Sequence, residues 1–224
     1  MIDGRNRRSS IGLVFILLLM LAPFVAWAQA PTGTIIGITS EGVVTPEENR
    51  EFRNILFRSF PRFPPRYTVE VYTVWYLTRD FDGAIVPVKA QLFVPQVIVA
   101  TEAPIFAFAS GTTGIPDRCA PSLEQPLIDR LGFYRTNMVE YASQGIVTIL
   151  PDYVGFNDDS RPQRYFSLEA EGHLMLDAIR AVQNFFTRPS ISRGRLRLSG
   201  HVFVGGYSQG GHAALAAADL RDRY

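Results

Sequence analysis

Residues 201–220 constrain the fold of this chain more than any other stretch of its sequence. The apolar run His201–Gly205 leads into Gly206-Tyr207-Ser208-Gln209-Gly210-Gly211, and an alanine-rich run, His212–Leu220, follows. This order predicts a buried strand, a sharp turn and a helix. Glycines two positions before and after Ser208 remove side chains that would collide in so tight a turn. We therefore expect Ser208 at the apex of a strained turn between a strand and a helix.

A serine in this context is typical of the nucleophile elbow of an α/β-hydrolase. The turn would lift the Ser208 hydroxyl above the edge of the sheet, where a substrate carbonyl can reach it. The start of the following helix would favour developing negative charge, because its backbone N–H groups are free. The alternative is an ordinary glycine-rich turn in a Rossmann-like domain, but the G-x-G-x-x-G spacing is absent here.

The length of 224 residues suffices for one domain with a sizeable core, and the net charge of +1 gives no electrostatic reason to expect nucleic acid as a partner. No metal or organic cofactor is implied, because the sequence has no cluster of cysteine and histidine at ligand spacing.

The first 28 residues have the features of a secretory signal peptide. Three arginines at positions 5, 7 and 8 precede the apolar run Ile11–Leu21, and Ala26-Trp27-Ala28 ends the segment. We expect cleavage after Ala28, which would release a secreted or periplasmic chain beginning at Gln29. The alternative is an N-terminal membrane anchor, since Ile11–Ala28 approaches the length of a membrane span, although Pro23 interrupts it.

The rest of the chain divides into an N-terminal extension, residues 29–66, and a core, residues 67–224. The extension is rich in proline, glycine and polar residues, and we expect one helix in it, over 46–59. In the core, two strands form an antiparallel hairpin, and short buried strands then alternate with helices. This pattern predicts an α/β sheet that is mostly parallel, with an antiparallel hairpin at its N-terminal end. Together with the elbow, it predicts an α/β-hydrolase fold. The expected strands are 67–78, 85–94, 104–109, 146–150 and 202–205, the expected hairpin turn is 80–83, and the expected helices are 133–144 and 168–186.

Acyl transfer needs two backbone N–H groups aimed at the oxyanion that develops on the substrate. One would come from Gln209, the residue after the serine, and the other from the loop after the third strand of the core. That loop is Ser110-Gly111-Thr112-Thr113-Gly114, and Thr112 is the expected donor within it. An ordinary glycine-rich turn is the alternative for this loop.

Four segments together give the core a family resemblance. They are Gly111-Thr112-Thr113-Gly114, Cys119-Ala120-Pro121-Ser122, Pro151-Asp152-Tyr153-Val154-Gly155 and Gly206-Tyr207-Ser208-Gln209-Gly210-Gly211. With these segments, residues 67–224 resemble the secretory lipase family of α/β-hydrolases, which implies that Ser208 is the nucleophile of a Ser-Asp-His triad acting on carboxylic esters. The resemblance also implies that Cys119 pairs with a cysteine much further along the chain. One departure is Ser110-Gly111, where many hydrolases have His-Gly.

The acid and the base of such a triad follow the serine in this fold, and no histidine of this sequence is a good substitute. His173 shares a helix face with Asp177 and Arg180, which favours a polar pair at the rim. His201 would lie more than about 20 Å from Ser208 along an extended strand, and His212 would lie under the elbow. Asp152 precedes the serine, and we expect it to brace a loop.

We therefore expect a C-terminally incomplete hydrolase core, whose full form has an Asp, a His and a Cys after Tyr224. A serine without its base loses about 10⁴–10⁶ in rate, and strands without neighbours leave an open sheet edge. The predicted activity is hydrolysis of a small ester or a lipid through an acyl-enzyme on Ser208. Contact with a lipid surface and the oligomeric state stay open. The alternatives are an exported serine peptidase on the same fold and a non-catalytic binding protein that keeps the fold.

Overall fold

The computed structural model describes residues 30–56, 63–124, 132–158, 160–188 and 195–224. The expected signal peptide, residues 1–28, lies outside the described residues. Contacts between residues divide the chain into Met1–Pro31 and Thr32–Tyr224, and the description below concerns the second unit. No helix among the described residues is long and apolar enough to cross a membrane.

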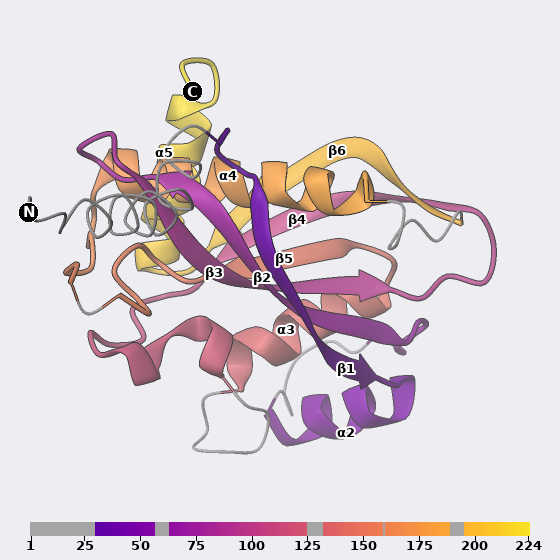
Figure 1. Ribbon diagram of the computed structural model, residues 1–224. Coiled ribbons are helices and arrows are strands. Elements are labelled where there is room, and N and C mark those ends of the chain that lie inside the picture. Colours follow the sequence, from indigo (N-terminus) through magenta and orange to yellow (C-terminus); the bar gives the residue numbers. More distant parts are fainter. Residues whose placement is uncertain (1–29, 57–62, 125–131, 159, 189–194) are drawn as a thin grey trace, which may run out of the picture. The chain divides into compact units, whose positions relative to one another are not determined.

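The unit is built on a six-stranded sheet with the strand order β1-β2-β3-β5-β4-β6 (Figure 1). The first three strands and β5 are joined by antiparallel pairings, whereas β5, β4 and β6 run parallel to one another. The α/β-hydrolase class predicted from the sequence is confirmed. The strands are β1 (Ile35–Val44), β2 (Val69–Arg79), β3 (Ile85–Pro95), β4 (Thr101–Ala109), β5 (Val147–Pro151) and β6 (Leu196–Gly206).

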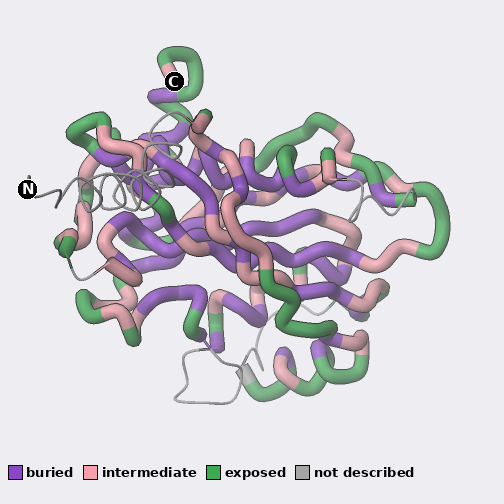
Figure 2. Tube along the Cα trace, in the orientation of Figure 1, coloured by how far each residue is buried: buried purple, intermediate pink, exposed green. Residues whose placement is uncertain are grey.

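Helices cover both faces of this sheet and bury two separate cores. On one face α4 (Leu168–Phe186) and α5 (Gln209–Leu220) pack against β-branched and small residues of the strands. On the other face α3 (Phe133–Ser143) covers a smaller cluster around Phe93 and Leu150. The buried residues accordingly follow the middle strands and the inner sides of α3 and α4 (Figure 2). The long helix lies at the residues predicted for it from its apolar periodicity.

The antiparallel part of the sheet is one strand longer than the predicted hairpin. The hairpin itself forms as expected, with Arg79 opposite Ile85 across the turn at Gly83. The additional strand, β1, pairs along nearly the whole of β2, in a segment for which the sequence predicted only a helix. That helix is also present, as α2 (Pro46–Leu56). The last strand, β6, begins at Leu196 rather than near 202, so His201 lies in the middle of it and not at its start.

The three parallel strands end at the same edge of the sheet, and their carboxyl ends carry the predicted site. The loop at 110–114 follows β4, residues 152–167 follow β5, and the turn at Ser208 joins β6 to α5. Open α/β sheets place ligands at this edge, beyond the carboxyl ends of the strands. The helices α4 and α5 pack closely against each other at Gly172. A Cβ at that position would lie only 3.0 Å from the backbone of Ala216.

Candidate functional site

Ser208 occupies the sharp turn predicted from the sequence. Its backbone has φ 52° and ψ −115°, a conformation that non-glycine residues rarely adopt. It precedes the first turn of α5, yet its side chain makes no capping hydrogen bond to the helix. The residue is exposed, so the hydroxyl faces solvent at the edge of the sheet. A strained, exposed serine between a strand and a helix is the geometry of a nucleophile elbow.

Two glycines allow this turn because no side chain fits at their positions. A Cβ on Gly206 would lie 2.1 Å from the carbonyl oxygen of Gly210, across the turn. A Cβ on Gly210 would lie 1.9 Å from the carbonyl oxygen of Ala109 at the end of β4. A Cβ on Gly211, in contrast, would lie no closer than 3.9 Å to an atom across the turn. The first two glycines of the motif are therefore required by backbone packing, and the third is not.

The loop after β4 lies directly against the elbow. Ala109 pairs with Gly206 across the sheet, and the N–H of Tyr207 donates to the Ala109 carbonyl oxygen at 3.3 Å. Among the described residues, neither the N–H of Thr112 nor that of Gln209 donates a hydrogen bond to another protein group. The two predicted donors thus belong to the two segments that meet at Ser208, and their N–H groups are free to bind an oxyanion.

Two tyrosines hold the first residues of this loop. The hydroxyl of Tyr153 donates to the Ser110 carbonyl oxygen at 2.5 Å, and the N–H of Gly111 donates to the hydroxyl of Tyr134 at 2.9 Å. Burial raises the pKa of both phenols, so they stay protonated. Because the peptide that joins Ser110 to Gly111 is held at both ends, the direction of the next N–H, at Thr112, is restricted. Sequence reasoning did not assign these tyrosines a role.

Asp152 braces the loop that carries Cys119, as expected. Its carboxylate is fully buried and accepts hydrogen bonds from the N–H and hydroxyl of Ser122, at 2.7 and 2.6 Å, and from Asn157 Nδ2 at 3.0 Å. Burial raises the pKa of Asp152 to about 6, and the bonds from Ser122 oppose that rise. Cys119 is a free thiol, close to Gly114.

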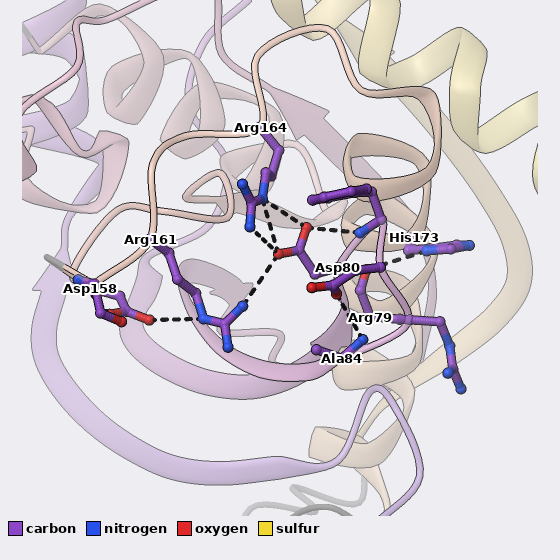
Figure 3. Close-up of polar contacts among 10 residues, drawn as sticks. Arg79, Asp80, Ala84, Asp158, Arg161, Arg164 and His173 are labelled. Atoms are coloured by element: carbon purple, nitrogen blue, oxygen red, sulfur yellow. Dashed lines mark hydrogen bonds and ion pairs between the residues drawn. The ribbon is translucent and has the colours of Figure 1, made fainter.

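A second buried carboxylate, Asp80, fixes the loop that follows β5. Arg164 Nε donates to both of its oxygens, at 3.1 and 3.0 Å, and Arg161 Nη1 lies 3.4 Å from one of them (Figure 3). Asp80 belongs to the hairpin turn, where sequence reasoning assigned it only a turn role. Its arginine partners follow it by more than 80 residues, and local patterns do not reveal such a pairing.

This loop places two aromatic side chains beside the elbow. The hydroxyls of Tyr165 and Thr112 are 3.1 Å apart, and the ring of Phe166 lies 4.8 Å from the ring of His212. Both aromatic residues are about half exposed, and Tyr207, next to the serine, is 69% exposed. Exposed aromatic rings and a few hydroxyl groups therefore lie on the segments that meet at Ser208.

The structure places none of the three histidines as a partner of the Ser208 hydroxyl. His173 is buried, with Nδ1 3.2 Å from the Arg79 carbonyl oxygen, so the expectation of a rim pair with Asp177 and Arg180 is wrong. His201 is exposed on β6. His212 Nδ1 donates to Glu171 at 2.5 Å. The described residues contain no group of three or more His, Cys, Asp or Glu side chains placed to hold a metal ion.

A cavity of about 390 Å³ lies elsewhere in the unit, lined by Tyr67, Phe185 and Leu196 among others, and none of the elbow residues contributes to it. This cavity is therefore not part of the site at Ser208.

Comparison with known proteins agrees with this geometry. Residues 132–224, which include the elbow, match the family model described as secretory lipase. The match covers the segments after β5 that carried the predicted resemblance. The comparison with curated protein sequences found no relative.

Solved structures share the fold at low sequence identity. The rice cell wall degrading esterase LipA from Xanthomonas oryzae superposes with a TM-score of 0.66 at 22% identity, over 87% of this chain and 47% of that protein. Candida antarctica lipase A in its closed state gives a TM-score of 0.61 at 21% identity, over 87% of this chain and 39% of the lipase. The chain thus spans less than half the length of these structures. At these identities the likeness shows the fold that the chain shares with part of each structure.

Proposed function

We propose that this protein is an exported serine hydrolase that cleaves carboxylic esters through an acyl-enzyme on Ser208. The observation that carries the proposal is the backbone of that serine, strained and exposed at the carboxyl end of β6. Strain of this kind costs about 1–3 kcal/mol and persists where the surrounding structure over-determines it. Here the close packing of Gly206 and Gly210 supplies that constraint.

In the proposed reaction the Ser208 hydroxyl gives up its proton to a general base, which the described residues do not place beside it. Its oxygen attacks the ester carbonyl carbon, and the carbonyl π electrons move onto the carbonyl oxygen. The N–H groups of Gln209 and Thr112 stabilise that oxyanion. The intermediate then expels the alcohol, which takes up the proton held by the base, and leaves an acyl group on the serine. Water hydrolyses this ester and restores the hydroxyl. Free N–H groups in a fixed loop suit this role, since they need no reorganisation as charge develops.

The substrate class follows from the apolar surroundings of the site. Tyr165, Phe166 and Tyr207 offer exposed rings beside the serine, which favours an acyl or aryl ester over a charged substrate. Two of the solved structures that share the fold are described as an esterase and a lipase, which agrees with an ester as the substrate.

Export is the second part of the proposal. The family to which residues 132–224 match is described as secretory, and the first 28 residues have the composition of a signal peptide. N-terminal sequencing of the exported chain should then begin at Gln29. A chain that retains its basic N-terminus in the membrane fraction would instead favour the anchor.

The test of the reaction uses p-nitrophenyl esters of increasing acyl length with the wild-type chain, Ser208→Ala and Ser199→Ala. Ser199 lies on the same strand and serves as the matched control. We expect slow ester turnover, because the described residues place no base beside the serine, and we expect it to be lost in Ser208→Ala and kept in Ser199→Ala. Turnover of p-nitroanilides in place of esters would favour a peptidase. Equal rates for the wild type and Ser208→Ala would contradict the proposal.

A further inference from the structure

Behind the elbow, one buried carboxylate joins the segments that surround Ser208. Glu171 lies in the first turn of α4 and is 2% exposed. Its Oε1 accepts from Gln209 Nε2 at 2.8 Å and from the N–H of Phe166 at 3.1 Å. Its Oε2 accepts from His212 Nδ1 at 2.5 Å. The reaction proposed above makes no direct use of this carboxylate.

A buried carboxylate needs its hydrogen bonds, because burying an unpaired charge costs several kcal/mol, on the order of the whole stability of a domain. In the described part of the chain no arginine or lysine bonds to Glu171, so these N–H donors are its partners. The same bonds therefore fix the donors. Each donor belongs to a segment next to the serine.

The first branch from Glu171 leads to the start of α5. Gln209 is 1% exposed, and its side chain is tied to α4 by the bond to Glu171. His212 is tied in the same way, and its own N–H donates to the Ser208 carbonyl oxygen at 3.3 Å. The first turn of α5, which begins with the proposed oxyanion donor Gln209, is thus held from its buried side.

The second branch leads to the loop after β4. Phe166 has φ 57°, and the bond from its N–H to Glu171 holds it in that conformation. Its ring lies 4.8 Å from the ring of His212. The preceding residue, Tyr165, reaches Thr112, with 3.1 Å between the two hydroxyl oxygens. A chain of contacts therefore runs from the carboxylate to the other proposed oxyanion donor.

We propose that Glu171 is a positioning residue that holds both oxyanion donors in place, Gln209 through its side chain and Thr112 through Phe166 and Tyr165. Glu171 does not touch the ester, so its effect on the rate acts through the orientation of the two N–H groups. The inference rests on the function proposed above, and it adds the residue on which the geometry of that site depends.

The substitution Glu171→Gln tests this role because it keeps the size of the side chain and removes one acceptor. The amide NH₂ donates, so the contact with His212 is kept only if Nδ1 of that ring accepts, and the bonds from Gln209 and Phe166 lose their charged acceptor and weaken. Since a misplacement of about 1 Å costs about 100-fold in rate, we expect serine reactivity to fall about 10- to 100-fold. The matched control is Asp177→Asn, on the same helix.

Asp177 is a suitable control because it is buried and accepts several hydrogen bonds away from the elbow. Its donors are Thr78, Arg180 and Tyr224, at 2.8, 2.7 and 2.8 Å. The measurement is the rate of labelling by a fluorophosphonate probe, with kcat and KM for a p-nitrophenyl ester beside it. We expect slower labelling and lower kcat at unchanged KM for Glu171→Gln alone. Wild-type labelling for Glu171→Gln, or an equal loss in both variants, would overturn the inference.

Hydrogen exchange gives a readout that does not depend on activity. We expect faster amide exchange over 110–114, 161–167 and 208–213 in Glu171→Gln, and wild-type exchange there in Asp177→Asn. If the wild type shows no labelling, the proposed function fails, and hydrogen exchange alone decides this inference. Unchanged exchange over 110–114 in Glu171→Gln would then overturn it. If Glu171→Gln does not fold, Gln209→Met removes the Nε2 donor and keeps the backbone N–H. A wild-type labelling rate in that variant would likewise overturn it.

Discussion

Substitution of Gly210 by alanine tests the packing that creates the elbow. The new Cβ would lie 1.9 Å from the Ala109 carbonyl oxygen and 2.7 Å from that of Ser110. Carbon and oxygen atoms approach to about 3.3 Å at the closest, so the elbow and the loop after β4 must separate by more than about 1 Å. Both obstructing atoms belong to the backbone and cannot rotate away as a flexible side chain would.

The expected cost follows from two opposing effects. Overpacking costs about 1–3 kcal/mol and occasionally more, while alanine in a helix gains up to about 1 kcal/mol over glycine. We expect the free energy of unfolding of Gly210→Ala to fall by about 2 kcal/mol. Labelling of Ser208 should fall about 100-fold, because separation of the loop misplaces an oxyanion donor.

Gly211→Ala is the matched control, one residue further along the same helix. Its Cβ would meet no atom closer than 3.9 Å, so only the helix propensity changes, and we expect a gain of up to about 1 kcal/mol. Urea unfolding followed by circular dichroism measures both variants. Equal stability of Gly210→Ala and Gly211→Ala would refute the close approach on which the elbow geometry rests.

Three further substitutions test the supports of the site. Because burial raises the pKa of Asp152 to about 6, the folded state binds more protons than the unfolded state between about pH 4 and 6. The contribution of Asp152 to stability is therefore largest below its unfolded pKa and is lost as the pH rises through about 6, by about 3 kcal/mol. Asp152→Asn should flatten that part of the curve of unfolding free energy against pH, and an unchanged slope would contradict the burial argument. Tyr153→Phe leaves the Ser110 carbonyl without its donor and should cost about 1–2 kcal/mol, with slower labelling of Ser208; unaltered labelling would show that the tyrosine does not orient the loop. Arg164→Met leaves the buried Asp80 carboxylate with fewer partners and should cost about 3 kcal/mol in urea unfolding, whereas a loss near zero would mean that Arg161 and the N–H of Phe81 satisfy it.

The elbow could be predicted from the sequence because its determinants are local. The order of strand, glycine-flanked serine and small-residue helix lies within 20 residues, and the backbone of Ser208 follows from it. The helix over 168–186 was predictable for a similar reason, because its apolar face repeats with the helical period. The bracing role of Asp152 could be inferred from its place directly after a buried strand.

The first strand was missed because it lacks the pattern that identifies a strand. Most of its residues are exposed or half buried, and glycines at positions 37 and 42 interrupt the alternation. Its pairing with β2 shifts register just before each of these glycines, which breaks the period of two. The early start of β6 was missed because Leu196 and Leu198 alternate with the polar residues Arg197 and Ser199, whereas the prediction relied on an apolar run.

The supports of the site could not be predicted because their partners lie far apart in the sequence. Glu171 is an acidic residue in the first turn of a helix, where a role in stabilising the helix dipole is the ordinary explanation. Only the fold brings it to Gln209 and His212, which follow it by 38 and 41 residues. The pairing of Asp80 with Arg164 spans 84 residues. Such carboxylates become visible as site residues only when their burial is known.

The central claim is that the hydroxyl at the apex of this turn is a nucleophile. Mass spectrometry of the chain after incubation with a fluorophosphonate tests it most directly. The account predicts one covalent adduct per chain, on the peptide that contains Ser208, and no adduct in Ser208→Ala. An adduct on another serine, or no adduct on the folded wild-type chain, would contradict it.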